Sequence, residues 1–219
     1  MPLFQVIRGL AAGFGNGSSP GARMTTLADQ VVCDFLQAMV LDGRGYQVRA
    51  GTVTTPLVGD VAITDTAAEM AADAATGTTI IPFSFRGTLD AQGGDAFEMA
   101  IKSVATASSS GTAFVPLPLL SGGSAAVSTA RVEAAGAVTV TAELATTTLR
   151  HFESSREFVQ DSAAESPVFV GELTWEPRAA PVLVGPRCFY VQIASATGGP
   201  SYFAHFDFIE GPTLLFVPS

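Results

Sequence analysis

The chain ends in the stretch SYFAHFDFIEGPTLLFVPS, residues 201–219, and the alternation in its first half decides the fold. If residues 201–209 form one extended strand, side chains at alternate positions share a face. One face then carries Tyr202, Ala204, Phe206 and Phe208, and the other carries Phe203, His205, Asp207 and Ile209. The pattern predicts a strand with one buried face and places His205 beside Asp207 on the less apolar face.

The pair of His205 and Asp207 has two interpretations. A metal-binding or general-base role needs further ligands or a nucleophile that converge on the pair, and the sequence indicates neither. A polar pair on the solvent or interface face of a strand is the simpler interpretation, and it is the one we expect.

The same period of two runs through most of the chain. It is clearest in residues 96–105, 137–144 and 167–177, where apolar and polar side chains alternate. Further strand candidates are Tyr46–Val53, Val58–Ile63, Thr79–Phe85, Ala113–Leu120 and Val182–Ile193. Turns rich in Gly, Pro and Ser separate these segments, and about nine or ten short strands favour a β-sandwich or barrel over alternating β and α units.

Two segments carry helical patterns instead. Residues 26–42 place apolar side chains at helical spacing, with Thr26 as the expected N-cap. Gly43 is expected to end the helix by taking the left-handed backbone conformation. Residues 65–77, DTAAEMAADAATG, predict a second and shorter helix that ends at Gly77. The apolar face of this second helix would be mostly alanine, which suits close packing on a sheet.

The composition is unusually apolar for a protein without membrane spans. Hydrophobic residues make up 47% of the chain and charged residues 14%, against a usual charged share of about 25%. No stretch reaches the roughly 20 uncharged apolar residues of a spanning helix, so we expect no transmembrane segment. A surface covered by partners explains the few charges, because interface cores are depleted of charge. A source organism that favours Ala and Gly is the alternative explanation.

The charge balance argues against nucleic acid as a direct partner. The net charge is −9, Lys102 is the only lysine, and the arginines are scattered singly. A chain without a basic arm or patch has nothing to neutralise phosphates, so we expect neither direct nucleic-acid binding nor attraction to an anionic membrane surface.

Metal and cofactor motifs are not evident. Cys33 and Cys188 lie far apart and are expected to be buried thiols. Two histidines and two cysteines cannot fill a usual zinc site without carboxylates. The segment GFGNGSSPG, residues 13–21, does not match the spacing of a phosphate-binding loop. The sequence therefore predicts no cofactor and no metal-binding residues.

The catalytic candidates are equally weak. The carboxylate pairs Glu172 with Glu176, and Asp90 with Asp95, serve glycoside chemistry only if folding brings each pair about 5 to 10 Å apart. His151 lies in LRHFESSREF, residues 149–158, where helix-spaced ion pairs or an exposed loop suffice as an explanation. We therefore expect no catalytic residues and no enzyme.

The arrangement of the chain resembles the single jelly-roll coat proteins of icosahedral viruses and phages. The features that carry the resemblance are short strands rich in Thr, Val and Phe, one well-capped helix near the start, a Gly/Ser arm at residues 9–23 and the Pro-bounded tail GPTLLFVPS, residues 211–219. It implies a mainly β fold, an antiparallel β-sandwich of jelly-roll type, with residues 1–23 as a flexible N-terminal arm and 24–219 as a single domain.

The resemblance also implies a function and a location. The chain would be a structural subunit of a capsid in the virion, assembling through apolar interfaces and extended termini with copies of itself or with a second coat protein. It lacks the basic N-terminal arm of many RNA-virus coats, so an acidic coat near an internal viral membrane fits better than direct contact with a genome.

Two other classes of protein remain as alternatives. A β-sandwich binding module, such as a fibre, adhesin or carbohydrate-binding domain, should present an exposed aromatic platform, and Trp175 with Phe169 are the candidates, although a core position suits them better. An enzyme on a β-scaffold has His205, Asp207 and one serine as its most economical set. We rank assembly first, the binding module second and the enzyme third.

Overall fold

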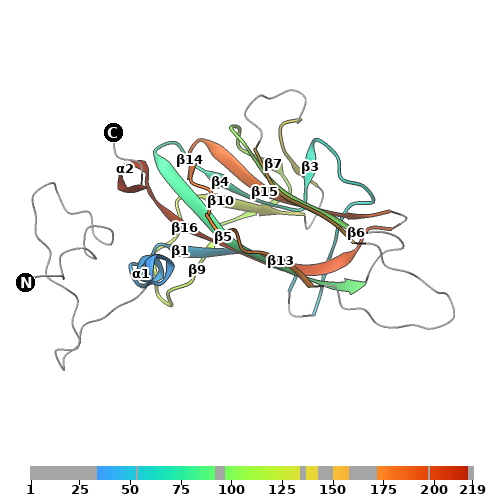
Figure 1. Ribbon diagram of the computed structural model, residues 1–219, viewed down its shortest axis with the longest axis horizontal. Coiled ribbons are helices and arrows are strands. Elements are labelled where there is room, and N and C mark those ends of the chain that lie inside the picture. Colours follow the sequence, from blue (N-terminus) through green and yellow to red (C-terminus); the bar gives the residue numbers. More distant parts are fainter. Residues whose placement is uncertain are drawn as a thin grey trace, which may run out of the picture.

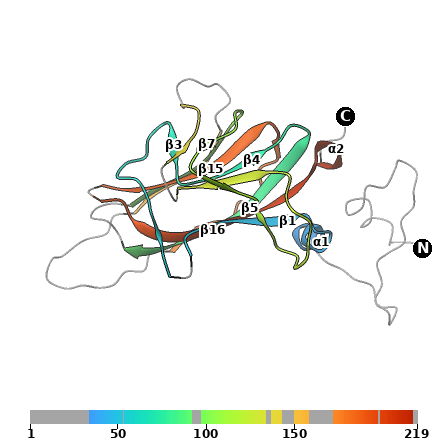
Figure 2. The ribbon, with the colours of Figure 1, turned by 180° about the vertical axis from the view of Figure 1, so that it is seen from behind.

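The computed structural model describes residues 34–52, 54–91, 97–133, 137–142, 150–157, 172–196 and 198–216. These residues form a mainly β structure in which two antiparallel sheets lie one over the other (Figures 1 and 2). The arm expected at residues 1–23 and the cysteine at position 33 lie outside the described residues.

The first sheet is seven-stranded and has the order β13-β5-β16-β1-β9, with β14 paired to β5 and β2 paired to β16. Its strands are β1 (Gly45–Ala50), β2 (Leu57–Val58), β5 (Thr78–Ala91), β9 (Leu117–Pro118), β13 (Glu172–Trp175), β14 (Leu183–Val184) and β16 (Ser201–Pro212). The long β16 lies between β1 and β5, so the stretch that opened the sequence analysis is a central strand of this sheet.

The second sheet is six-stranded and has the order β12-β6-β15-β4-β10-β8. Its strands are β4 (Met70–Ala74), β6 (Phe97–Val104), β8 (Thr112–Phe114), β10 (Thr129–Val132), β12 (Arg150–Glu157) and β15 (Arg187–Ser195). A small three-stranded sheet consists of β3 (Ala67–Ala68), β11 (Val138–Thr139) and β7 (Ser109–Ser110).

The alternation predicted for β16 is confirmed over residues 202–208, where the even-numbered side chains are buried and the odd-numbered ones are half-buried. The buried side chains meet those of the second sheet in one core. Phe206 of β16 and Phe189 of β15 are both fully buried, and their rings meet edge to face with centroids 5.2 Å apart. Burying each such side chain contributes roughly 1.5 to 3 kcal/mol, so this pair helps to hold the two sheets together.

The first predicted helix is shorter than expected. Helix α1 (Phe35–Leu41) begins after Asp34, whose extended backbone and side chain cap the helix by accepting a hydrogen bond of 2.7 Å from the Gln37 amide. The expected cap, Thr26, lies outside the described residues. Gly43, with φ +74°, follows the helix in the left-handed conformation that was expected.

Two helices cover part of the outer face of the first sheet. Met39 of α1 packs with Ile81 and Ile209, and Phe216 of α2 (Thr213–Phe216) joins the same cluster. No helix among the described residues is long and apolar enough to cross a bilayer.

The helix predicted at residues 65–77 is wrong, because this segment forms β3 and β4. Strand β4 lies between β10 and β15 and is buried on both sides. Ala72 faces the main core, while Ala71 faces a second cluster with Tyr190. With both faces apolar the strand shows no alternation, and alanine's helix propensity is a weak preference that strand pairing overrides. Gly77 takes φ +83° in the turn into β5 instead of ending a helix.

The prediction for residues 149–158 is also wrong. Residues 150–157 form neither a helix nor a loop but the edge strand β12, which pairs antiparallel with β6. The pairing slips at a bulge between His151 and Glu153, which interrupts the strict alternation that would have marked a strand.

Candidate functional site

The pair of His205 and Asp207 lies on the outer face of the first sheet. Asp207 accepts two hydrogen bonds of 3.0 Å, one from the Gln47 amide nitrogen and one from the Ser84 hydroxyl. The serine therefore bonds directly to the carboxylate, whereas a base-activated serine needs a histidine between the two. The position is the polar outer face that the simpler interpretation predicted.

His205 stands in a row of basic residues across this outer face. Strand pairing places it opposite Arg49 on β1 and opposite Arg86 on β5. Arg86 forms an exposed ion pair with Glu176 at 3.1 Å, an arrangement that contributes little stability. The row borders a shallow outer hollow of about 360 Å³ that Glu172 also lines.

The other acidic and histidine candidates occupy exposed positions. Glu172 and Glu176 flank β13 on its exposed side, and Asp90 lies exposed near the end of β5. Asp95, the expected partner of Asp90, lies outside the described residues. His151 is exposed on the edge strand β12.

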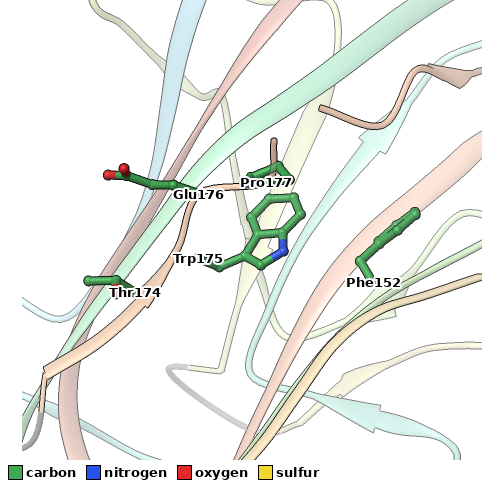
Figure 3. A pocket seen from close by; sticks show the side chains of 5 residues that line it. All are labelled: Phe152, Thr174, Trp175, Glu176 and Pro177. Atoms are coloured by element: carbon green, nitrogen blue, oxygen red, sulfur yellow. The ribbon is translucent and has the colours of Figure 1, made fainter. Parts of the chain in front are cut away.

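Trp175 belongs to the core, as the sequence analysis preferred. Its side chain is 5% exposed, and its ring lies 5.8 Å from that of Phe189 and 6.4 Å from that of Phe152. Figure 3 shows the indole facing Phe152, while Thr174 and Glu176 point to the other side of the strand. The hollow of about 570 Å³ beside the ring lies at the edge strands β12 and β13. Phe169, the expected platform partner, lies outside the described residues.

Cys188 is a buried thiol, as predicted. It is fully buried on β15, and burial, with the nearby negative charge of Asp73 as a second cause, raises its pKa well above the ordinary thiol value. Asp73 itself accepts hydrogen bonds from the amide and the hydroxyl of Ser108, at 2.8 and 2.6 Å. A thiol kept protonated in this way is inert as a nucleophile.

Figure 1 shows α1, β9 and α2 at one end of the molecule, and these elements and the segment after β9 carry exposed apolar side chains. We call this surface the apolar end, and its members are Leu41, Leu117, Leu119, Leu120, Val127 and Leu214. Leu214 on α2 is 76% exposed. Large apolar groups exposed together mark interaction surfaces, whereas single ones need no explanation.

Local contacts hold the apolar end in shape. The Leu119 amide donates a 2.9 Å hydrogen bond to the Gly45 carbonyl, which fixes the chain after β9 against β1. A Cβ atom at Gly45 would lie 2.6 Å from Val40 and 3.1 Å from Leu119, so only glycine lets α1 and this loop approach so closely. A hollow of about 370 Å³ separates the end of α1 from residues 124–127 and the end of β16.

Three carboxylates meet beside β15. One oxygen from each of Asp60, Glu69 and Glu133 lies within 4.8 Å of the other two. Backbone bonds place them: the amide of Asp60 donates to the Ile193 carbonyl at 3.1 Å, and the amide of Glu133 donates to the Glu69 carbonyl at 2.9 Å. We call this group, together with the hydroxyl of Tyr202, the carboxylate cluster.

Glu69 is the most buried of the three carboxylates, at 1% exposed. Its carboxylate accepts hydrogen bonds from the amides of Ile193 at 2.7 Å and Asp60 at 3.3 Å. Burial raises its pKa well above the ordinary value, and the charges of Asp60 and Glu133 add to the rise, while the two amide bonds oppose it. The pKa of Glu133 is raised too, first by burial and then by the charge of Asp60.

No pattern in the sequence predicted the carboxylate cluster, and no metal-binding residues were expected. Its members come from the connection after β2, the residue before β4 and the residue after β10, so no spacing in the sequence links them. A Glu within a segment that forms a buried strand can indicate such a cluster, because an ionisable side chain is seldom fully buried without a partner. That signal was hidden here, because residues 65–77 were expected to form a helix.

Comparisons of the chain with protein-family models, with curated proteins and with solved structures found no match. The proposals below therefore rest on residues and geometry.

Proposed function

We propose that the chain is a structural subunit of a viral or phage capsid, located in the virion, and that its sandwich is of the jelly-roll type. Strand pairing supports the fold. Taken in chain order, eight strands pair first with last, second with seventh, third with sixth and fourth with fifth. These pairs are β1 with β16, β4 with β15, β5 with β13, and β6 with β12.

This order is what a single long antiparallel hairpin produces when it rolls up on itself. The roll brings β5 beside β16 and β6 beside β15, which are the contacts that complete the two sheets. Jelly rolls of this kind occur in capsid proteins but also in lectin domains and cupins, so the fold alone does not select the function.

The observation that carries the proposal is the apolar end. Leucines on α1, around β9 and on α2 are exposed to solvent, and no part of the described chain covers them. The protein also has few charged residues that would repel a neighbouring copy. Copies of the same chain, or a second coat protein, can cover such a surface. The net charge of −9 supports partners of this kind over nucleic acid, and it leaves an internal viral membrane as a neighbour in place of a genome.

The described part of the tail packs on its own subunit, whereas an extended terminus was expected to reach a neighbouring subunit. Residues up to Pro212 stay in the chain's own first sheet, where Pro212 pairs with Thr78. Phe216 then packs into the cluster under α1. Deleting residues 211–219 would therefore damage the subunit itself, and a point substitution at Leu214 is the cleaner test of assembly.

The test is the mass of the full-length protein in solution, by light scattering after size exclusion, with electron microscopy of any large fraction. We expect rings, trimers or shells, and we expect Leu214→Asp to shift them towards the 22.5 kDa monomer without lowering thermal stability. The control is Val58→Asp, which places the same charge on an exposed β2 residue that pairs near the start of β16, away from the apolar end. A wild-type protein that stays monomeric at all concentrations would refute the proposal.

The binding module is less well supported. Its expected platform residue Trp175 is buried among Phe152 and Phe189, so it cannot offer a flat exposed ring to a ligand.

A further inference from the structure

We propose that Asp60, Glu69, Glu133 and the hydroxyl of Tyr202 bind a divalent cation, with calcium as the best match. The proposal is independent of assembly, because all four residues belong to one chain. The carboxylate cluster lies beside β15 and not at the apolar end.

Charge is the first argument. Three carboxylates whose oxygens lie within 4.8 Å of one another, one of them fully buried, repel each other strongly unless protons or a cation neutralise them. Both oxygens of Glu69 already accept hydrogen bonds from backbone amides, an arrangement that favours the ionised carboxylate. A cation lets the carboxylates stay ionised, whereas shared protons would not.

Unpaired oxygens are the second and independent argument. Glu133 Oε2 and the hydroxyl of Tyr202 are both buried, and neither has a hydrogen-bond partner among the described residues. Tyr202 is 0% exposed, and an unpaired buried hydroxyl costs stability that native proteins seldom give up. A cation among these oxygens gives both of them a partner.

The buried hydroxyl of Tyr202 lies within electrostatic range of the three carboxylates. The negative charges of Glu69, Glu133 and Asp60 act on its hydroxyl and, after burial, are the causes that raise its pKa. A neutral phenol oxygen beside three carboxylates can complete the ligand shell of a cation without losing its proton.

The donor set selects the kind of cation. All four side chains offer oxygen and none offers nitrogen or sulfur, which favours a hard ion over zinc or copper. Calcium binds six to eight oxygens at about 2.3 to 2.6 Å in a flexible geometry, which a mixed set of carboxylates and a hydroxyl can supply. Magnesium needs shorter bonds of about 2.0 to 2.1 Å in a strict octahedron, which irregular connections provide less readily.

A bound cation would add a cross-link between segments of the two sheets. Asp60 follows β2 and Tyr202 lies on β16, which both belong to the first sheet, whereas Glu69 precedes β4 and Glu133 follows β10, which both belong to the second sheet. The ion would therefore tie the two sheets together at this point, and its effect should appear as stability of the subunit.

The test uses the purified full-length protein, stripped with a chelator and unfolded by heat with and without calcium chloride. At a calcium concentration of about 100 times the dissociation constant, we expect the midpoint of thermal unfolding to rise by about 5 to 10 °C. We expect Glu133→Gln to abolish this rise and, in chelator, to be at least as stable as wild type because it removes repulsion. The control is Glu172→Gln, the same chemical change on an exposed side chain, which should respond as wild type does.

A second measurement does not depend on the stability of Glu133→Gln. Terbium substitutes for calcium and luminesces when a nearby tyrosine is excited, so wild-type protein should sensitise terbium and calcium should displace it. Tyr202→Phe removes the hydroxyl ligand and also the nearest sensitising phenol, so this variant is compared with Tyr46→Phe by the calcium-dependent rise of the thermal midpoint, which we expect to be smaller. No calcium response of the stripped wild-type protein, or an equal response in Glu133→Gln, would overturn the cation site in favour of shared protons. An equal rise with magnesium would overturn the assignment to calcium.

Discussion

Glu210 holds the loop of the apolar end, and its replacement by glutamine should loosen that loop. The side chain is 6% exposed, and its two oxygens accept hydrogen bonds of 2.7 Å from the amides of Val127 and Ser128. These bonds fasten the segment before β10 to the end of β16. Glu210→Gln keeps the size of the side chain but offers one acceptor oxygen in place of two.

The expected loss follows from the unmatched amide. A hydrogen bond to a charged acceptor contributes about 1.5 to 3 kcal/mol, and a buried donor left facing an NH2 group costs a similar amount. We therefore expect Glu210→Gln to lower the free energy of unfolding by about 2 to 4 kcal/mol. At about 2 to 4 °C for each kcal/mol in a chain of this size, the thermal midpoint should fall by about 5 to 15 °C.

The assay is urea unfolding followed by tryptophan fluorescence, with thermal scans in parallel and Glu172→Gln as the exposed control. Because Val127 belongs to the apolar end, the variant should also assemble less well than the control at temperatures where both are folded. A loss below about 0.5 kcal/mol, which is the usual range for surface changes, would refute the role assigned to Glu210.

Two further predictions concern the core. Phe206→Ala should lower the free energy of unfolding by about 3 to 5 kcal/mol, because it leaves a cavity against Phe189. The control Val58→Ala, on the exposed β2, should change it by no more than about 0.5 kcal/mol. Equal losses of the two variants in urea unfolding would contradict the core position of Phe206. Cys188 should resist iodoacetamide in the folded protein at pH 8 and react after denaturation, as read by peptide mass spectrometry, and rapid labelling of the folded chain would contradict its burial. Since the folded pKa of this thiol is raised, its contribution to stability is complete below the unfolded pKa of about 8.5 and is lost as the pH rises above it.

Much of the β architecture was predictable because alternation is a local property. The faces of β16, the core position of Trp175, the burial of Cys188 and the left-handed end of α1 at Gly43 all agree with the sequence analysis. Each of these depends on side chains within one segment. A strand with one buried and one solvent-exposed face shows the alternation of apolar and polar residues directly in its sequence.

The failures have a shared cause. Residues 70–74 are alanine-rich and were expected to be helical, but β10 and β15 pair with them on either side and both faces are buried, so neither alternation nor propensity indicated a strand. The bulge near His151 hid β12 in a similar way.

The sequence by itself determined that the chain is mainly β, which face of β16 is buried, and that charged residues are few. The tertiary structure alone decided which strands pair and, through that pairing, that the carboxylates of Asp60, Glu69 and Glu133 meet. The reason is physical: propensity and periodicity act over a few residues, whereas strand pairing and the convergence of carboxylates depend on contacts between segments far apart in the chain, which no local pattern records.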